Sequence, residues 1–258
     1  MFTAKKPVIY IGFDEREKNA FEVLRQSILR YNKEYDIIPL FQHSLRRAGL
    51  YRRAARLDSV DGKRIMVDEM DGRPFSTQFT FTRFLVPALN QYDGWALFMD
   101  SDMLVRSDIR ELFDEYTKNE HYAVQCVKHN YNPSKSVKMD GQIQQKYNRK
   151  NWSSLMLWNC SHAANLRLTV DDANVKPGSW LHGMEWLEDE EIGHISEEWN
   201  WLDDWSSEHI NPKNVHFTTG GPWFTEWEPK RQSDINYAGE WQSLNSKIMA
   251  DKMLGEII

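Results

Sequence analysis

Apolar runs and helical patterns alternate at the start of the chain. Residues 8–13 and 35–41 are apolar runs of the length of a strand. Residues 17–31 lie between them and place apolar side chains, among them Leu24 and Ile28, at the spacing of one helix face. This order predicts a β-α-β unit of the type found in nucleotide-binding folds.

The same patterns continue along the rest of the chain. Apolar runs predict further strands at residues 95–99, 122–127, 154–158 and 215–217. Helical patterns predict a helix at residues 76–90 that begins at a serine cap, a short helix at residues 108–116, and a closing helix from residue 241 onwards. The sequence shows no repeat, low-complexity run or linker, so a single domain is expected.

Three segments lack a clear apolar pattern. Residues 45–71 are strongly charged and rich in arginine, which predicts a solvated helix and loop. Residues 129–150 are polar and predict a loop or a mobile lid. Residues 179–205 are rich in tryptophan and are expected to be helical in part.

The apolar run at residues 95–99 ends in two carboxylates, Asp100 and Asp102, and apolar residues resume directly afterwards. The pair is therefore embedded in core sequence. Two close carboxylates repel each other and are costly to desolvate. A divalent cation would relieve both problems, and Mg²⁺ or Mn²⁺ prefers carboxylate oxygens shared with a substrate diphosphate. The pattern predicts a metal–diphosphate site, although a capped turn is an alternative.

Composition narrows the classes of function. The net charge of -6 argues against broad binding of nucleic acid or anionic membranes. Two isolated cysteines, Cys126 and Cys160, form neither a disulfide framework nor a zinc site. The apolar run near the N-terminus is too short for a signal peptide or a membrane span, so a cytoplasmic protein is expected. The oligomeric state stays open.

Tryptophan is frequent, with 11 copies. Core packing explains most single tryptophans, but several crowd into one region, and aromatic platforms suit the apolar faces of sugars. A carbohydrate acceptor groove is therefore expected near these residues: Trp180, Trp186, Trp199, Trp201, Trp205, Trp223 and Trp227.

Taken in order, these pieces resemble the GT-A glycosyltransferases, most closely glycosyltransferase family 8 and its bacterial and viral relatives. The similarity extends over residues 8–223. Its motifs are YIGFD at residues 10–14, FTFTRFLVP at 79–87, LFMDSDMLV at 97–105 with SDIRELF at 107–113, and HFTTGGPW at 216–223. Residues 195–202 are also similar to the Leu-Pro-x-x-Trp-Asn signature of the family.

The resemblance implies an α/β fold of the GT-A, Rossmann-like type, with a mixed, mainly parallel sheet flanked by helices. One domain would span residues 1–258. Its donor-binding half would cover about 1–127, its acceptor side and metal-binding histidine about 128–229, and its closing helical tail 230–258.

The resemblance also implies the ligands of the site. Asp100, Asp102 and His216 would bind Mn²⁺ or Mg²⁺, and the donor would be a nucleotide-sugar linked to UDP. Asp14 would contact the base, and Arg83 would pair with a carboxylate or the donor. The implied donor-binding residues are Ile11, Gly12, Asp14, Arg83, Asp100, Ser101, Gly220 and Gly221. Transfer to a carbohydrate or other hydroxyl acceptor, with retention of configuration, is expected.

The chain departs from the family pattern at the phosphate site. The family lysine before the final Pro-Trp is replaced by Gly221. Backbone N–H groups of Gly220 and Gly221 are one substitute, as an anion nest. Lys150, Arg149 or an arginine of residues 45–71 are alternative sources of positive charge.

Two family segments that contact sugar also differ. The Asn-x-Ser-Gly segment appears as Trp152, Ser153 and Ser154. The Asp-Gln-Asp segment is replaced by residues 181–185, in which His182 and Glu185 are the expected catalytic groups on the acceptor side. Sugar specificity therefore cannot be transferred from the family.

Other interpretations stay open. Asp14 is alternatively a helix cap, Arg83 half of a core ion pair, and His216 a structural histidine. A haloacid-dehalogenase-type phosphohydrolase would use Asp100 as nucleophile and residues 203–204 as its later acidic pair. A noncatalytic carbohydrate-binding protein would use the tryptophan-rich region alone.

Overall fold

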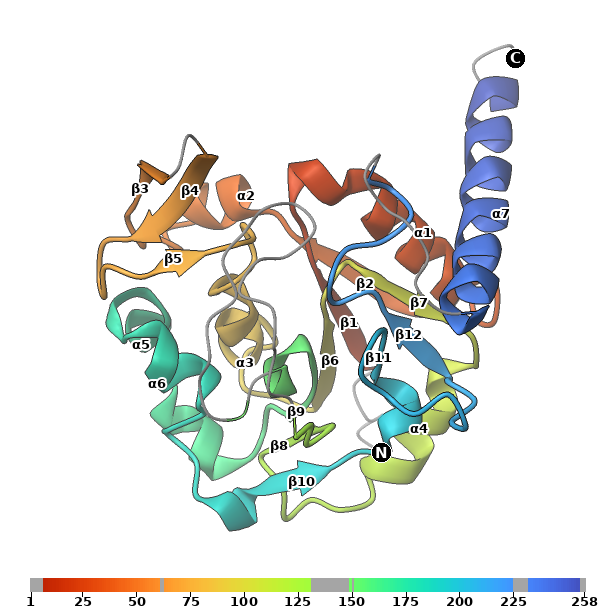
Figure 1. The fold of residues 1–258 in the computed structure, drawn as a ribbon. Coiled ribbons are helices and arrows are strands. Elements are labelled where there is room, and N and C mark those ends of the chain that lie inside the picture. Colours follow the sequence, from red (N-terminus) through yellow and green to blue (C-terminus); the bar gives the residue numbers. More distant parts are fainter. Residues whose placement is uncertain (1–6, 61–62, 131–148, 150, 225–231, 256–258) are drawn as a thin grey trace.

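The structure, a computed structural model, describes residues 7–60, 63–130, 149, 151–224 and 232–255 (Figure 1). Its central element is a six-stranded sheet in the order β10-β8-β9-β6-β1-β2. The strands are β1 (Val8–Gly12), β2 (Asp36–Leu40), β6 (Trp95–Met99), β8 (Val124–Cys126), β9 (Leu155–Asn159) and β10 (Ile192–His194). Only β9 runs antiparallel to its neighbours. The expected mixed, mainly parallel sheet is confirmed.

Both faces of this sheet are buried. Along β1, Ile9 and Ile11 join one apolar cluster, while Tyr10 joins the cluster on the opposite face. Strands buried on both faces are nearly continuous apolar runs in the sequence, which is why the strands could be predicted there.

Helices cover the two faces. The cluster of Ile9 and Ile11 includes residues of α1 (Lys18–Leu29) and α4 (Ile109–Tyr116). The opposite cluster includes residues of three short helices: α3 (Val86–Leu89), α5 (Val170–Val175) and α6 (Gly178–His182). Among the predicted helices, α1 and α4 are confirmed, and Asp108 caps α4 by accepting a hydrogen bond from the backbone N–H of Arg110.

Two smaller sheets lie beside the central one. The first has the order β11-β12-β7 and comprises β11 (Trp201–Leu202), β12 (Asn214–His216) and β7 (Met103–Val105). Antiparallel pairing of β12 and β7 sets His216 opposite Met103, one residue after Asp102. The second sheet, β3-β4-β5, comprises β3 (Ala55–Val60), β4 (Lys63–Asp68) and β5 (Pro74–Phe75). The first small sheet therefore brings two distant parts of the chain to one point.

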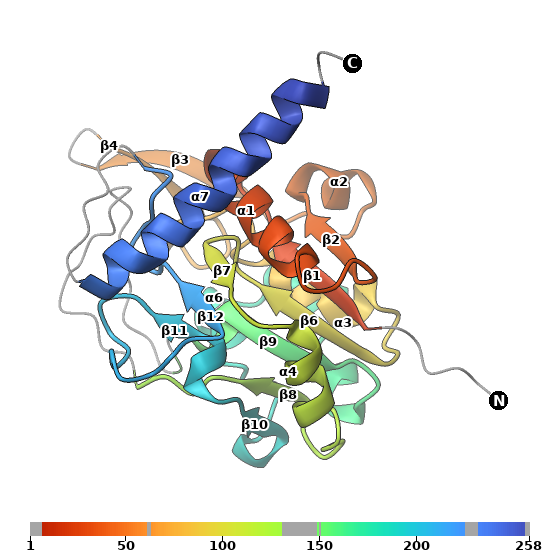
Figure 2. The same ribbon diagram turned by 90° about the vertical axis from the view of Figure 1, so that its right-hand side faces the viewer.

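The remaining elements are α2 (Gln42–Arg47), the closing helix α7 (Gln232–Gly255) and short 3₁₀ helices. The latter are η1 (Glu15–Glu17), η2 (Thr82–Leu85), η3 (Trp152–Ser154), η4 (Ala163–Arg167), η5 (Asp189–Glu191) and η6 (Glu197–Trp199). Helix α7 packs along α1, and its C-terminal turns extend beyond the rest of the ribbon (Figure 2). No helix in the described part of the chain has the length and apolar character needed to cross a membrane.

The predicted helix at residues 76–90 is wrong in its first half. Only η2 and α3 are helical, and Ser76 caps neither of them. The first half is rich in Phe and Thr, which are weak helix formers. Phe79 and Phe81 are instead buried at 2% and 3% exposure, in the apolar cluster beside the sheet. Tertiary packing has overridden a weak local preference.

The solvated helix and loop predicted at residues 45–71 are also wrong in large part. Residues of β3 and β4 form an antiparallel hairpin. Ile65 and Val67 are buried on one face of β4, so the segment has the two-residue period of a strand. Charged residues between these positions conceal that period in the sequence.

Candidate functional site

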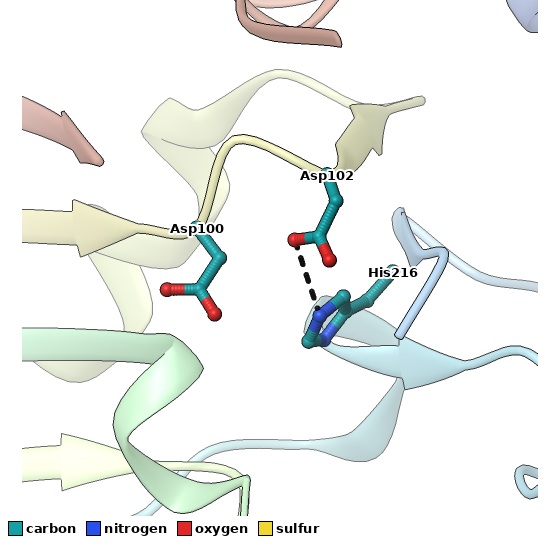
Figure 3. A group of neighbouring side chains, drawn as sticks. All are labelled: Asp100, Asp102 and His216. Carbon is teal, nitrogen blue, oxygen red and sulfur yellow. Dashed lines mark ion pairs between the residues drawn. The ribbon is translucent and has the colours of Figure 1, made fainter. Parts of the chain in front are cut away.

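Three potential metal ligands converge where β6, β7 and β12 meet (Figure 3). Asp100 follows β6, Asp102 precedes β7, and His216 is the last residue of β12. One ligand atom from each residue lies within 4.8 Å of the other two. Asp102 Oδ1 lies 3.3 Å from His216 Nε2, and the backbone N–H of Phe217 donates to the carbonyl of Asp102. Strand pairing thus fixes the histidine against the acidic motif.

The environment of His216 favours its charged form. Burial lowers the pKa of the imidazole, but the carboxylates of Asp102, Asp100 and Asp203 outweigh burial and raise that pKa above its ordinary value. When no metal ion is bound, the imidazole therefore binds a proton more readily than a free histidine does, because carboxylates surround it.

Arg83 pairs with the first carboxylate of the motif. Its Nη1 lies 2.8 Å from Asp100 Oδ1 and also donates to the carbonyl of Ser153. The guanidinium lies over the ring of Phe98, 4.9 Å from the centroid. The structure thus gives Arg83 the carboxylate partner that the sequence suggests, within a largely buried ion pair.

The donor set fits a divalent cation. Two carboxylates and one imidazole offer oxygen and nitrogen ligands, a combination compatible with Mn²⁺ and Mg²⁺, and the imidazole favours Mn²⁺ of the two. Within the described residues, Arg83 is the cationic side chain paired with Asp100. A cation that displaces the proton of His216 would meet ligands already gathered from separate strands.

The site opens into a cavity of about 1170 Å³, a volume that includes space open to solvent. Glu17, Asp102 and Gly220 line it near the metal ligands. Phe81 and His182 line it as well, from the side of η2 and α6. The cavity therefore joins the acidic motif to the helices that cover one face of the sheet.

Asp14 is fully buried after β1. It accepts a hydrogen bond from the backbone N–H of Arg16 as the cap of η1, pairs with the Arg16 guanidinium at 2.8 Å, and accepts from the backbone N–H of Gln78 at 3.0 Å. Burial raises the pKa of Asp14, and the hydrogen bonds and the charge of Arg16 lower it by more. The pKa of this carboxyl is therefore below its ordinary value. The alternative role as a helix cap is therefore present, and the base contact stays a prediction.

Gly12 has a packing role. A Cβ atom at this position would lie 2.4 Å from Phe79 Cδ2, so only glycine lets the ring approach β1. Ile11, its neighbour in the strand, is completely buried in the core. Gly12 therefore shapes the cavity wall through Phe79, which lines it, whereas Ile11 belongs to the apolar cluster on the opposite face of the sheet.

Ser101, the middle residue of the acidic motif, is also buried. Its hydroxyl donates to Glu17 Oε2 at 3.1 Å, and Glu17 lines the cavity. Glu17 is a carboxylate near the site that the sequence analysis missed, because it lies in an ordinary helix start. Its pairing with Ser101 depends on the folded arrangement of β6 and α1.

The two glycines of the motif, Gly220 and Gly221, have different roles beside the cavity. Gly220 lines the cavity and has a φ of 117°, a conformation that favours glycine. A Cβ atom at Gly221 would lie 2.2 Å from Trp223 Cζ3, so Gly221 permits the indole to pack on the loop. The role of Gly221 is thus a close approach, while the anion nest stays a prediction.

The charge that would replace the family lysine has few sources. Arg149 donates to the carbonyl of Gly183 and pairs with Asp189, so its guanidinium is held there. Lys150 lies outside the described residues. Arg73, which the sequence analysis missed, lines the cavity from the turn between β4 and β5. Among the described residues, Arg73 and Arg83 are the arginines that line the cavity.

His182 and Glu185 have different positions. His182 lines the cavity, and its Nδ1 lies 2.8 Å from the hydroxyl of Ser153. Glu185 is exposed and is not among the cavity-lining residues. Of the two expected catalytic groups on the acceptor side, the structure therefore brings one to the cavity.

Most of the tryptophan-rich region is core. Trp186, Trp199 and Trp201 are at most 4% exposed, so the groove expected from them is wrong for these three. Trp205 is 40% exposed. Trp227 and most of the polar stretch at residues 129–150 lie outside the described residues.

Solved structures share this fold at low sequence identity. GlyE from Streptococcus pneumoniae, a glycosyltransferase, matches 96% of this chain and 64% of its own, with a TM-score of 0.55 and 14% identity. The galactosyltransferase LgtC matches 93% of this chain and 95% of its own, with a TM-score of 0.51 and 13% identity. The bifunctional WbbM matches with a TM-score of 0.52 and 18% identity. The chain spans 46% of the WbbM chain.

At these identities the similarity shows the fold alone, which is that of the GT-A glycosyltransferases. A search against models of known protein families finds no match. Protein CDI of Arabidopsis thaliana is 40% identical over 252 residues, a stretch that covers 94% of this chain and 90% of Protein CDI. The chain therefore belongs to the family of Protein CDI, built on a GT-A fold.

Proposed function

We propose that the protein is a metal-dependent glycosyltransferase. It moves a sugar from a nucleotide-sugar, linked to UDP, to a hydroxyl of a carbohydrate or other acceptor. The observation that carries this proposal is the convergence of Asp100, Asp102 and His216 within 4.8 Å, beside a cavity that Asp100 and Asp102 line. The GT-A fold supports the same class of reaction.

In this proposal, Asp100, Asp102 and His216 hold Mn²⁺ or Mg²⁺. Such an ion supplies Lewis-acid stabilisation of the charge that develops on the donor diphosphate. Arg83 holds the carboxylate of Asp100 in place through their 2.8 Å ion pair. Retention of configuration belongs to the proposal through the family resemblance.

The nucleotide would lie over the carboxyl end of β1. This end of the sheet carries the residues expected to contact the donor, and ligands of open α/β sheets bind beyond the carboxyl ends of strands. Glu17 and Gly220 line the cavity on this side. The proposed donor contacts are Asp14, Arg83, Asp100, Gly220 and Gly221, and the buried residues Ile11, Gly12 and Ser101 would support them from the core.

The sugar and acceptor would lie toward α6. His182 faces this part of the cavity beside Ser153, and it is the proposed acceptor-side group. Glu185 enters the proposal only through the family segment that it replaces, because its side chain is exposed away from the cavity lining.

The two alternative functions have less support. GlyE and LgtC, which share the fold, are glycosyltransferases, and this favours the proposed function over a phosphohydrolase. A noncatalytic carbohydrate-binding protein would use the tryptophan-rich region, but Trp199 and Trp201 are buried.

The test is a thermal-shift panel of nucleotides with and without Mn²⁺, on the wild type and on Asp102→Asn. We expect UDP to stabilise the wild type only when Mn²⁺ is present, since ligand binding to the folded state raises the melting temperature. Asp102→Asn should fold and lose this response. Stabilisation by GDP alone would change the donor, and no response to any nucleotide would overturn the proposal.

A further inference from the structure

A chain of buried hydrogen bonds leads away from the metal ligands. Asn200, the residue after η6, donates from Nδ2 to the hydroxyl of Ser154 at 2.9 Å. Asn200 Oδ1 lies 3.0 Å from His216 Nδ1. The hydroxyl of Ser154 donates in turn to the carbonyl of Asn151 at 2.7 Å. The chain thus connects η3 to β12 through a single amide.

The directions of these hydrogen bonds determine which nitrogen of a neutral His216 carries the proton. Because Ser154 gives its only hydroxyl proton to a carbonyl, it can only accept from Asn200. The NH₂ group of Asn200 must therefore face Ser154, and its carbonyl oxygen must face His216. A carbonyl oxygen only accepts, so the proton of a neutral imidazole lies on Nδ1.

This tautomer leaves the other nitrogen for the metal. With Nδ1 protonated, the lone pair of neutral His216 is on Nε2, the atom 3.3 Å from Asp102 Oδ1. The other tautomer would place a proton where the cation must bind. Metal-bound histidines commonly donate their second N–H to an oxygen of the surrounding shell, which fixes both tautomer and ring orientation.

The residues of this hydrogen-bond chain are buried. Ser154 is 3% exposed and His216 is 2% exposed, while Asn200 is completely buried. Ser154 lines the cavity, but the amide of Asn200 is out of reach of water, so an amide turned the wrong way would bury unmatched polar groups.

Ser154 also holds the acidic motif. Its carbonyl accepts a hydrogen bond from the backbone N–H of Asp100 at 2.9 Å. The hydroxyl of the same residue reaches His216 through Asn200. This one residue, directly before β9, is therefore bonded to Asp100 and, through Asn200, to His216 on a separate strand.

We propose that Ser154 and Asn200 are positioning residues that hold His216 in the Nδ1–H tautomer, with Nε2 ready for a divalent cation. The inference rests on the proposed metal site. Loss of such a partner is expected to weaken Mn²⁺ binding by about 10–100-fold. The effect acts through His216, since neither side chain belongs to the converging ligand atoms.

The first measurement is Mn²⁺ affinity, from the electron paramagnetic resonance signal of free Mn²⁺ with nucleotide absent. Ser154→Ala should weaken binding, because the amide of Asn200 loses the acceptor that sets its orientation. Ser153→Ala is the matched control: it is equally 3% exposed and adjacent, but its hydroxyl contacts His182. Its Mn²⁺ affinity should equal that of the wild type.

Substitutions of the amide separate positioning from packing. Asn200→Leu removes the acceptor and should weaken Mn²⁺ binding, whereas Asn200→Asp keeps an acceptor for Nδ1–H and should bind Mn²⁺ more tightly than Asn200→Leu. Circular dichroism and melting temperature show which variants are folded. Equal Mn²⁺ affinity in wild type, Ser154→Ala and a folded Asn200→Leu would overturn the proposal.

The second measurement needs no metal. In the ¹⁵N spectrum of histidine-labelled protein at alkaline pH, His216 should show a protonated Nδ1 in the wild type and a mixture of tautomers in Ser154→Ala. A wild type with this tautomer and no Mn²⁺ binding would refute the proposed function while leaving the positioning role intact. A wild type protonated on Nε2 would refute the positioning role.

Discussion

At the scale of single residues, close approaches shape the cavity wall as much as the charged groups do. Gly12→Ala would place a methyl group 2.4 Å from the ring of Phe79, which is 2% exposed. The ring would have to move, and we expect a loss of about 1–3 kcal/mol in the free energy of unfolding, as for other overpacked sites. Urea denaturation measures this loss.

Gly239→Ala is the control for this prediction. A methyl group at this position would have no neighbouring atom within 4 Å, and the residue lies in α7. Alanine is the better helix former, so a gain of about 0.5–1 kcal/mol is expected. Equal effects of the two substitutions would show that contact with Phe79 is not what requires glycine at position 12.

The sequence identifies residues of this site best when they belong to a short motif. Asp100 and Asp102 could be predicted because they follow an apolar strand, and His216 because the motif at residues 216–223 resembles the metal-binding motif of the family. Glu17 and Asn200 could not, since their roles come from contacts with Ser101 and His216 across the fold. Asn200 lies in the segment that is similar to the Leu-Pro-x-x-Trp-Asn signature, but neither this segment nor the helix start at Glu17 shows which side chains the two residues contact.

At the scale of elements, a buried ion pair ties the β3–β4 hairpin to the helices beside the cavity. Arg53 pairs with Asp68 in a bidentate contact, and both side chains are 1% exposed. Arg53 also donates to the carbonyls of Ala173 and Lys176, and its guanidinium lies 3.9 Å from the ring centroid of Phe81. The pair joins three segments that are distant in sequence.

Asp68→Asn should therefore be strongly destabilising. It leaves the charge of Arg53 buried without its counter-charge, and a cost of about 3–5 kcal/mol is expected. Asp58→Asn breaks the pair with Arg56 in the same hairpin, whose side chains are 38% and 49% exposed. That control should cost about 0–1 kcal/mol. Chemical denaturation of both variants decides whether burial, and not charge alone, sets the difference.

This hairpin also shows where element prediction fails. Long strands of the central sheet are buried on both faces, so β1 and β6 were predictable from apolar runs alone. The hairpin is half exposed, and Leu57 is 68% exposed, so its pattern is a mixture of charges and single apolar residues. The helix expected at residues 76–90 fails for the complementary reason, because aromatic packing there replaces helical hydrogen bonds.

At the scale of the whole molecule, α7 covers the loop that follows His216. Trp241 is 2% exposed and packs near Trp223, with ring centroids 5.7 Å apart. Trp241→Ala should cost about 3–5 kcal/mol, as for other buried large-to-small changes. Met253→Ala, at 65% exposure on the same helix, should change stability by less than about 0.5 kcal/mol. Equal losses in a thermal or urea titration would place the stabilising contact elsewhere.

A proton and a metal ion compete for His216, so they should have opposite effects on how the free energy of unfolding changes with pH. The pKa of His216 is raised in the folded protein: burial lowers it, and Asp102 and its neighbouring carboxylates raise it by more. The charged imidazole therefore contributes stability that is complete below the pKa of the unfolded state. This contribution is lost as pH rises through the raised folded pKa. Metal-free protein should thus lose stability over that window.

Mn²⁺ reverses the direction, because the cation requires the neutral imidazole. Its stabilisation should grow as pH rises through the same window. The measurement is the free energy of unfolding from about pH 6 to about pH 9 with and without Mn²⁺. His216→Gln should abolish both slopes together, since one imidazole binds either the proton or the metal. A Mn²⁺ effect that keeps its pH slope in His216→Gln would exclude this histidine as the competing ligand.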